Sequence, residues 1–222
     1  LEANAAEILA ANEQDLEHGA ANGLAIGLQD RLRLTTERIA SLASAVREII
    51  ALADPVGEIV SGRTLHNGLK ISQVRVPFGV IGMIYEARPN VTIDIAALAI
   101  KSGNALVLRG GSAAEKTNAV LIRLVRRALD DCGISPDVIQ SVDEFGRDGA
   151  KAIMMARGLV DVLIPRGSAN LIKTVVEESK VPVIETGDGI VHIYVDESAD
   201  LDKAIPIIIN SKTQRPSVCN SL

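Results

Sequence analysis

The stretch GVIGMIYEARPNVTIDIAALAIKSGNALVLRGG, residues 79–111, decides the fold class of this chain. It opens with an apolar run that predicts a buried strand over 79–86. A helix is predicted over 90–103, closed by a glycine, and a second strand over 104–111. A strand, a helix and another strand in this order indicate a βαβ unit, whose strands lie parallel with the helix across one face.

The same alternation continues beyond residue 111. A long helix is predicted over 112–133, starting at a capping Ser112 with Glu115 at capping-box distance and stopping at Gly133. Further strands and helices are expected in the segments 137–143, 147–157, 160–168, 169–180, 181–189, 191–198 and 199–212. This pattern predicts an α/β fold with a Rossmann-like, mostly parallel sheet that carries helices on both faces.

The residues before position 79 show a different sequence pattern. Apolar residues recur every three or four positions over 1–53, which predicts helices that end at Asp54-Pro55. An Asn67-Gly68 pair between two extended segments then predicts a β-hairpin over about 56–77.

Composition narrows the classes of function. Aromatic residues make up 2% of the chain, which leaves little surface for stacking single-stranded bases. A net charge of -5 argues against duplex DNA, and no apolar run approaches the length of a membrane span. The three histidines lack metal-ligand spacing, so no metal site is predicted. Two cysteines are too few for a disulfide framework and favour a reduced, cytoplasmic setting.

Ligands of open α/β sheets bind beyond the carboxyl ends of the strands, so the loops after the predicted strands carry the candidate sites. Two such loops join a strand to a helix start, where free N–H groups attract an anion. They consist of Arg109, Gly110, Gly111 and Ser112, and of Arg166, Gly167 and Ser168. Either loop alone could be an ordinary tight turn between a strand and a helix. Two such loops in one sheet favour a dinucleotide ligand. The G-x-G-x-x-G fingerprint of standard dinucleotide-binding folds does not occur in the sequence.

Other loops carry polar candidates for recognition and catalysis. Glu86, Arg88 and Asn90 follow the first strand, where groups of both signs suit substrate recognition or oxyanion stabilisation. Asn90 is also in position to cap the next helix. Glu185 follows a later strand, and three interpretations of it are open: a catalytic base, a ligand of a cofactor hydroxyl, or a carboxylate that faces solvent.

Cys219 is the best candidate nucleophile in the chain. It follows a predicted helix, and Lys212 and Arg215 place positive charge near it, which favours the reactive thiolate. Cys132, at the end of an amphipathic helix, is instead expected to be a small buried hydrophobe.

The segments 74–111, 163–172, 181–200 and 212–220 closely resemble the gamma-glutamyl phosphate reductase family. These glutamate-5-semialdehyde dehydrogenases belong to the aldehyde dehydrogenase superfamily. The resemblance implies an aldehyde-dehydrogenase-like fold and the second step of proline biosynthesis. In that step NADPH reduces L-glutamyl 5-phosphate to L-glutamate 5-semialdehyde, and phosphate is released.

The resemblance also assigns roles to residues. Cys219 matches the nucleophile, which forms a thioester. Residues 109–112 match the segment that holds the adenosine end of NADP(H), and 166–168 match the loop at the cofactor phosphates. Glu185 matches the general base of hydrolytic members, and Asn90 takes the oxyanion role from a shifted position.

The resemblance finally implies a domain organisation and partners. Residues 1–187 form the NADP(H)-binding domain, with its α/β core over 78–187, and 188–222 begin a catalytic domain. Family members continue past the nucleophile, and this chain begins with Leu1, so we expect truncation at both ends and an inactive isolated chain. The full-length enzyme is expected to form a homo-oligomer with a functional link to glutamate 5-kinase, without nucleic-acid or membrane partners.

Two other interpretations remain open. In a hydrolytic aldehyde dehydrogenase, Glu185 activates water. In a catalytically silent nucleotide-binding fragment, the chain serves binding or assembly. NADP is preferred over NAD in the main hypothesis because Arg109 and Lys116 are expected to face a ribose 2′-phosphate.

Overall fold

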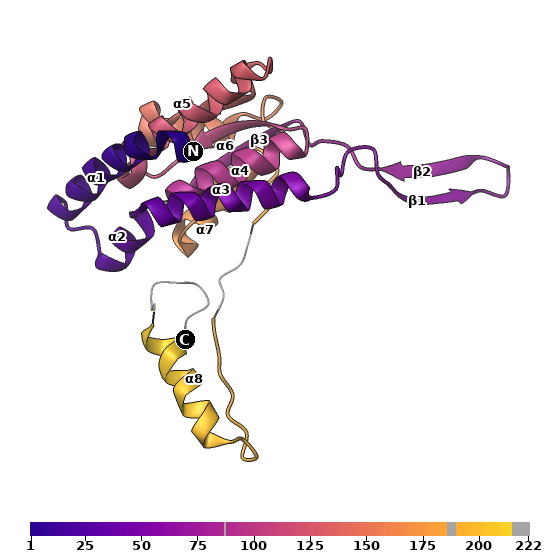
Figure 1. Ribbon diagram of the computed structural model, residues 1–222. Helices are drawn as coiled ribbons and strands as arrows, with labels where there is room; N and C mark the ends of the chain where they lie inside the picture. The colour runs from indigo at the N-terminus through magenta and orange to yellow at the C-terminus, as the bar shows by residue number, and fades with distance from the viewer. Residues whose placement is uncertain (87, 186–189, 215–222) are drawn as a thin grey trace.

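The computed structural model describes residues 1–86, 88–185 and 190–214 of the chain. At its centre lies a four-stranded parallel sheet in the order β5-β4-β3-β6 (Figure 1). The strands are β3 (Val80–Tyr85), β4 (Ala105–Arg109), β5 (Ile139–Ser141) and β6 (Val162–Arg166). The predicted α/β fold with a mostly parallel sheet is confirmed.

Helices cover both faces of the sheet, which is why β3, β4 and β6 are apolar along nearly their whole length. On one face pack α4 (Pro89–Lys101) and α5 (Glu115–Asp131), closing a core that includes Met83, Ala96, Leu108 and Leu129. On the other face pack α6 (Gly146–Met155) and α7 (Ala169–Glu178), with Ile84, Ile153, Leu163 and Val175 between them and the sheet.

The N-terminal helices form a third layer outside α4 and α5 (Figure 1). They are α1 (Ala5–Ala21), α2 (Ile26–Leu32) and α3 (Thr36–Ala51), preceded by the 3₁₀ turn η1 (Glu2–Asn4). Ile8, Ile39 and Leu42 meet Ile93, Leu121 and Leu124 in a third apolar cluster. The apolar residues that recur every three or four positions over 1–53 therefore pack against other helices rather than against the sheet.

A two-stranded antiparallel hairpin extends away from these layers (Figure 1). It consists of β1 (Ile59–Thr64) and β2 (Lys70–Val74), and every residue of both strands is exposed. Gly68 in its turn has a φ of 84°, a conformation that glycine adopts without strain.

The predicted start of the long helix was wrong, whereas its predicted end is confirmed. α5 begins at Glu115, after the 3₁₀ turn η2 (Ser112–Ala114), and Ser112 makes no capping bond. The cap comes instead from Asp15 of α1, as described below. At the other end Gly133 has a φ of 74°, which lets the chain turn away from the helix. Cys132 is exposed there, so its predicted burial was also wrong.

The strand predicted over 191–198 was wrong as well. All of these residues are described and none is in a strand, because an extended segment without a neighbouring strand has no ladder of hydrogen bonds to join. The strand predicted over 181–189 is reduced, in its described part, to one bridge between Val183 and Leu163. The helix predicted after them is present as α8 (Leu201–Thr213).

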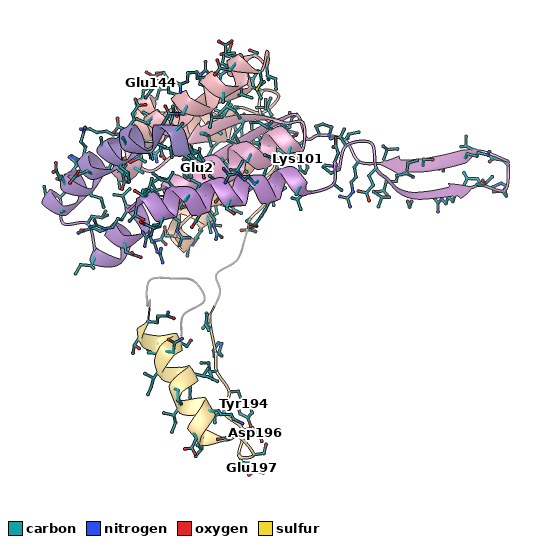
Figure 2. The ribbon with its side chains drawn as sticks, in the orientation of Figure 1. Glu2, Lys101, Glu144, Tyr194, Asp196 and Glu197 are labelled. Atoms are coloured by element: carbon teal, nitrogen blue, oxygen red, sulfur yellow. The ribbon has the colours of Figure 1, made fainter. Side chains whose placement is uncertain are left out.

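The segment 190–214, which contains α8, has no buried residue. Among the residues that the structure describes, none on α8 is buried. Tyr194 and Glu197 lie beside this helix, apart from the sheet and the helices that cover it (Figure 2). None of the helices within the described ranges combines the length and the apolarity that crossing a bilayer requires.

Candidate functional site

Three of the predicted loops leave the sheet at the same edge. The register pairs Ile84 with Arg109 and Tyr85 with Arg166, so β3, β4 and β6 end at one level. Ligands of open parallel sheets bind at this edge. The structure therefore brings Glu86, the loop after Arg109 and the loop after Arg166 to neighbouring positions, as the sequence predicted.

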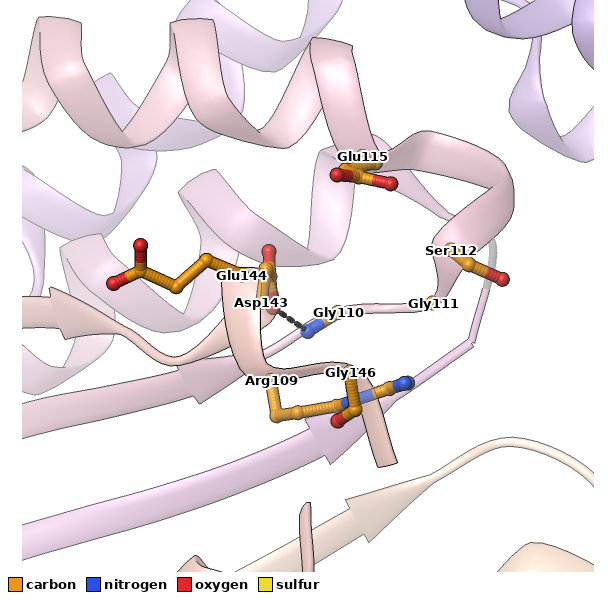
Figure 3. Close-up of a pocket in the computed structure, with 8 residues that line it drawn as sticks. All are labelled: Arg109, Gly110, Gly111, Ser112, Glu115, Asp143, Glu144 and Gly146. Atoms are coloured by element: carbon orange, nitrogen blue, oxygen red, sulfur yellow. Dashed lines mark hydrogen bonds between the residues drawn. The ribbon is translucent and has the colours of Figure 1, made fainter. Parts of the chain in front are cut away.

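A cavity of about 170 Å³ opens where β4 ends (Figure 3). Its lining residues are Arg109, Gly110, Gly111, Ser112, Glu115, Asp143, Glu144 and Gly146. Sites that enclose a whole small molecule usually measure about 300–1,000 Å³. This cavity is therefore suited to one part of a dinucleotide, such as a ribose with a phosphate.

Asp143 connects two walls of the cavity. It opens the 3₁₀ turn η4 (Asp143–Phe145), and its Oδ1 accepts a hydrogen bond from the Gly110 amide at 2.6 Å (Figure 3). Arg109 donates through Nε to the carbonyl of Gly146 at 3.2 Å. Burial raises the pKa of the Asp143 carboxyl, and the bond from Gly110 opposes this shift.

Sequence reasoning missed the residues of this second wall, Asp143, Glu144 and Gly146. The signal was available, because Asp143 ends the segment 137–143 that was predicted to be a strand. Any residue that follows a parallel strand at its carboxyl end belongs at the ligand-binding edge.

Buried polar side chains support the cavity from beneath. The Tyr85 hydroxyl and Thr92 Oγ1 are 2.7 Å apart, and Thr92 donates to Asn118 Oδ1 at 2.9 Å. A Cβ added at Gly110 would lie 2.2 Å from Asn118 Nδ2, so any other residue at this position would require the Asn118 side chain to move. Burial raises the pKa of the Tyr85 hydroxyl further above neutral pH.

Two amides in the first turn of α5 already bond a side chain of α1, so they are not free for the anion that the sequence predicts at this helix start. The amides of Lys116 and Thr117 donate to the Asp15 carboxylate at 3.2 and 2.7 Å. The Lys116 ammonium donates to Gln14 Oε1 at 2.9 Å, on the side of α1. Lys116 is not among the residues that line the cavity, so the geometry does not support its predicted place beside a cofactor phosphate.

The second predicted phosphate loop contacts a residue from another candidate group. Ser168 caps α7 with its hydroxyl, which accepts from the Leu171 amide at 3.4 Å. The same hydroxyl donates to Glu86 Oε1 at 2.6 Å. The Glu86 amide donates to the carbonyl of Arg166 at 3.1 Å. Glu86 and the 166–168 loop thus form one unit.

The remaining candidates lie around this unit or outside the described residues. Arg88 is the residue before α4, and its amide donates to the Glu86 carbonyl at 2.7 Å. Asn90 lies inside the first turn of α4, where its Nδ2 donates to Asp94 Oδ2 at 3.3 Å, so the alternative that it caps this helix was wrong. Glu185 is exposed, and Cys219 lies outside the described residues.

The described part of the chain offers no candidate metal site. Within residues 1–86, 88–185 and 190–214, no group of three His, Cys, Asp or Glu side chains is placed to hold a metal ion.

Comparison with known proteins identifies relatives of the whole chain. Proteins named gamma-glutamyl phosphate reductase from Kineococcus radiotolerans and Leifsonia xyli subsp. xyli are 59% identical over 221 residues and 62% identical over 220 residues. These matches include 100% and 99% of this chain, and 51% and 52% of the relatives. The chain therefore spans about half the length of the curated relatives it matches.

Solved structures agree with this relationship. The crystal structure of gamma-glutamyl phosphate reductase from Thermotoga maritima is 44% identical, with a TM-score of 0.86 over 98% of this chain and 53% of that one. An acetylating aldehyde dehydrogenase from Geobacillus thermoglucosidasius, 21% identical with a TM-score of 0.64, shares the fold. Residues 3–216 match the model of the aldehyde dehydrogenase family, and the chain therefore belongs to that family.

Proposed function

We propose that this chain supplies the cofactor-binding part of a reductase that converts L-glutamyl 5-phosphate to L-glutamate 5-semialdehyde and phosphate. The observation that carries the proposal is its 59% and 62% identity, along the whole chain, to two proteins named gamma-glutamyl phosphate reductase. The family implies a nicotinamide cofactor, and we propose NADP(H).

The residues of the cavity fit the adenosine end of such a cofactor. Arg109 offers a fixed positive charge and Ser112 a hydroxyl to a phosphate, while Glu115 and Asp143 offer acceptors to ribose hydroxyls. The 166–168 loop lies at the same edge and is the proposed place of the cofactor diphosphate. When bound, the cofactor supplies the hydride for the reaction.

The proposed nucleophile is Cys219. Its thiolate attacks the acyl carbon of the substrate, phosphate leaves, and a thioester forms. Reduction then gives a thiohemiacetal, whose collapse releases the aldehyde and regenerates the thiolate. Asn90 is proposed to stabilise the oxyanion, and Glu86 and Arg88 to contact the substrate. Glu185 has no required part in this route, because hydrolysis of the thioester would waste the acyl phosphate.

We also propose that residues 1–187 form the cofactor-binding domain and that 188–222 belong to a second, catalytic domain. The exposed apolar side chains of α8 support this division, since Ile205, Ile207 and Ile209 have 51%, 61% and 56% of their surface exposed. Apolar residues on one helix are normally buried against other elements. A homo-oligomer and a functional link to glutamate 5-kinase complete the proposal for the full-length enzyme.

The reaction is tested in the oxidative direction, with glutamate 5-semialdehyde, NADP⁺ and inorganic phosphate. A full-length enzyme that contains this chain is expected to form NADPH only when phosphate is present. The 222-residue chain alone is expected to bind NADP(H) without turnover. Oxidation to the free acid at the same rate without phosphate would favour the hydrolytic alternative, in which Glu185 activates water.

The preference for NADP(H) is tested by Arg109→Ala. Loss of a charge-assisted hydrogen bond to the 2′-phosphate is expected to weaken NADP⁺ binding about tenfold more than NAD⁺ binding. Isothermal titration of both nucleotides gives the two dissociation constants. Lys116→Ala is the matched control, because it removes the same charge from a side chain that bonds Gln14 instead. Equal weakening of both nucleotides by Arg109→Ala would contradict the assignment.

A further inference from the structure

The Glu86 carboxylate lies where the strand order of the sheet reverses. From β3 the chain passes to β4 and β5 on one side of the sheet, and then to β6 on the other side. The connecting helices change faces at the same point, α4 and α5 on one face and α6 on the other. Ligands of open α/β sheets bind in the crevice at such a point. Glu86 follows β3, and Gly167 and Ser168 follow β6, so these residues border that crevice.

The contacts of Glu86 place its side chain directly on the first turn of α7. Ser168 Oγ donates to Glu86 Oε1 at 2.6 Å, and the Glu86 amide donates to the Arg166 carbonyl at 3.1 Å. A Cβ added at Gly167 would lie 2.6 Å from Glu86 Cδ and 2.8 Å from its Cγ. Absence of a side chain at Gly167 thus leaves the space that the carboxylate fills.

The Ser168 hydroxyl serves this carboxylate more than its own helix. Its contact with the Leu171 amide is 3.4 Å long, beyond the usual range for an N–H···O bond. A hydroxyl can donate one hydrogen bond, and here the acceptor is the Glu86 carboxylate. The positive end of the α7 dipole favours an anion at the same place.

A cofactor diphosphate at this loop would be a second anion beside Glu86. Two like charges placed side by side repel each other, and the repulsion is stronger near a protein surface than in bulk water because the effective dielectric constant is lower. We infer that Glu86 is an internal competitor of the cofactor phosphates: its carboxylate leaves Ser168 when the diphosphate binds and thereby lowers the affinity for the cofactor. This inference rests on the proposed function.

The experiment is a fluorescence titration of the 222-residue chain with NADPH, comparing wild type with Glu86→Gln. Glutamine keeps the size of the side chain and removes its charge, so the dissociation constant is expected to fall about threefold to tenfold. The difference is expected to shrink as sodium chloride is raised, because salt screens the repulsion. The matched control is Glu178→Gln, an exposed residue at the other end of α7, which is expected to leave the constant unchanged.

A second ligand separates competition at the phosphate loop from a general effect of charge. Adenosine 2′-monophosphate lacks the diphosphate, so its affinity is expected to be equal in wild type and Glu86→Gln. An equal gain for both ligands, or NADPH binding that is unchanged or weaker in the variant, overturns the inference while leaving the cofactor site intact. If neither wild type nor Glu86→Gln binds NADPH, the proposed cofactor site is wrong, and the inferred competition is wrong as well. If Glu86→Gln does not fold, Glu86→Asp withdraws the carboxylate from Ser168 and is expected to tighten binding as well.

Discussion

Replacing Cys219 with alanine is expected to lower phosphate-dependent turnover of the full-length enzyme by a factor of about 10³ or more. The thioester route needs a thiolate at this position, and no other group in the proposal accepts the acyl chain. The phosphate-dependent rate of NADPH formation from glutamate 5-semialdehyde gives the turnover number. NADPH binding is expected to be unchanged, since the cavity and the 166–168 loop are elsewhere in the chain.

Cys132→Ala is the matched control for this variant. Cys132 is exposed at the end of α5, whereas the cavity lies at the start of that helix. Its replacement is expected to change turnover by less than about twofold, as for an ordinary surface substitution. Phosphate-dependent turnover that survives in Cys219→Ala would remove Cys219 from the mechanism and would favour another acceptor of the acyl group.

The fold was predictable because its signals are local. Strand β3 is buried on both faces, so it stands out as a short apolar run over 80–85, and glycines such as Gly133 mark where helices stop. The neighbourhood of Glu86, Arg109 and Arg166 was predictable as well, because parallel strands end at one edge.

The remaining errors concern contacts between distant parts of the chain. Nothing near Ser112 indicates that the acceptor for the start of α5 is Asp15, which lies about a hundred residues earlier in the sequence. The bond between Glu86 and Ser168 also joins two separate loops. The extended segment 191–198 has the composition of a strand, but a strand exists only when another strand is beside it.

Asp15→Ala is expected to lower the free energy of unfolding by about 3 kcal/mol. The side chain is 4% exposed, and its two oxygens accept from the amides of Lys116 and Thr117 and from Thr117 Oγ1 at 2.6 Å. Alanine leaves these donors without an acceptor, and Thr117 is fully buried, so water does not replace the carboxylate. Urea unfolding followed by circular dichroism gives the change in free energy.

Two further variants separate the cap from a simple loss of charge. Glu13→Ala removes an exposed carboxylate two positions earlier on α1 and is expected to cost less than about 0.5 kcal/mol. Because Asp15 and Thr117 share one network, the double variant Asp15→Ala, Thr117→Ala is expected to lose less stability than the sum of the single losses. Full additivity, or equal losses in Asp15→Ala and Glu13→Ala, would mean that this carboxylate does not hold α1 to the start of α5. The first turn of α5 continues from Ser112 at the cavity, so the same cap fixes the helix on which that wall of the nucleotide site is built.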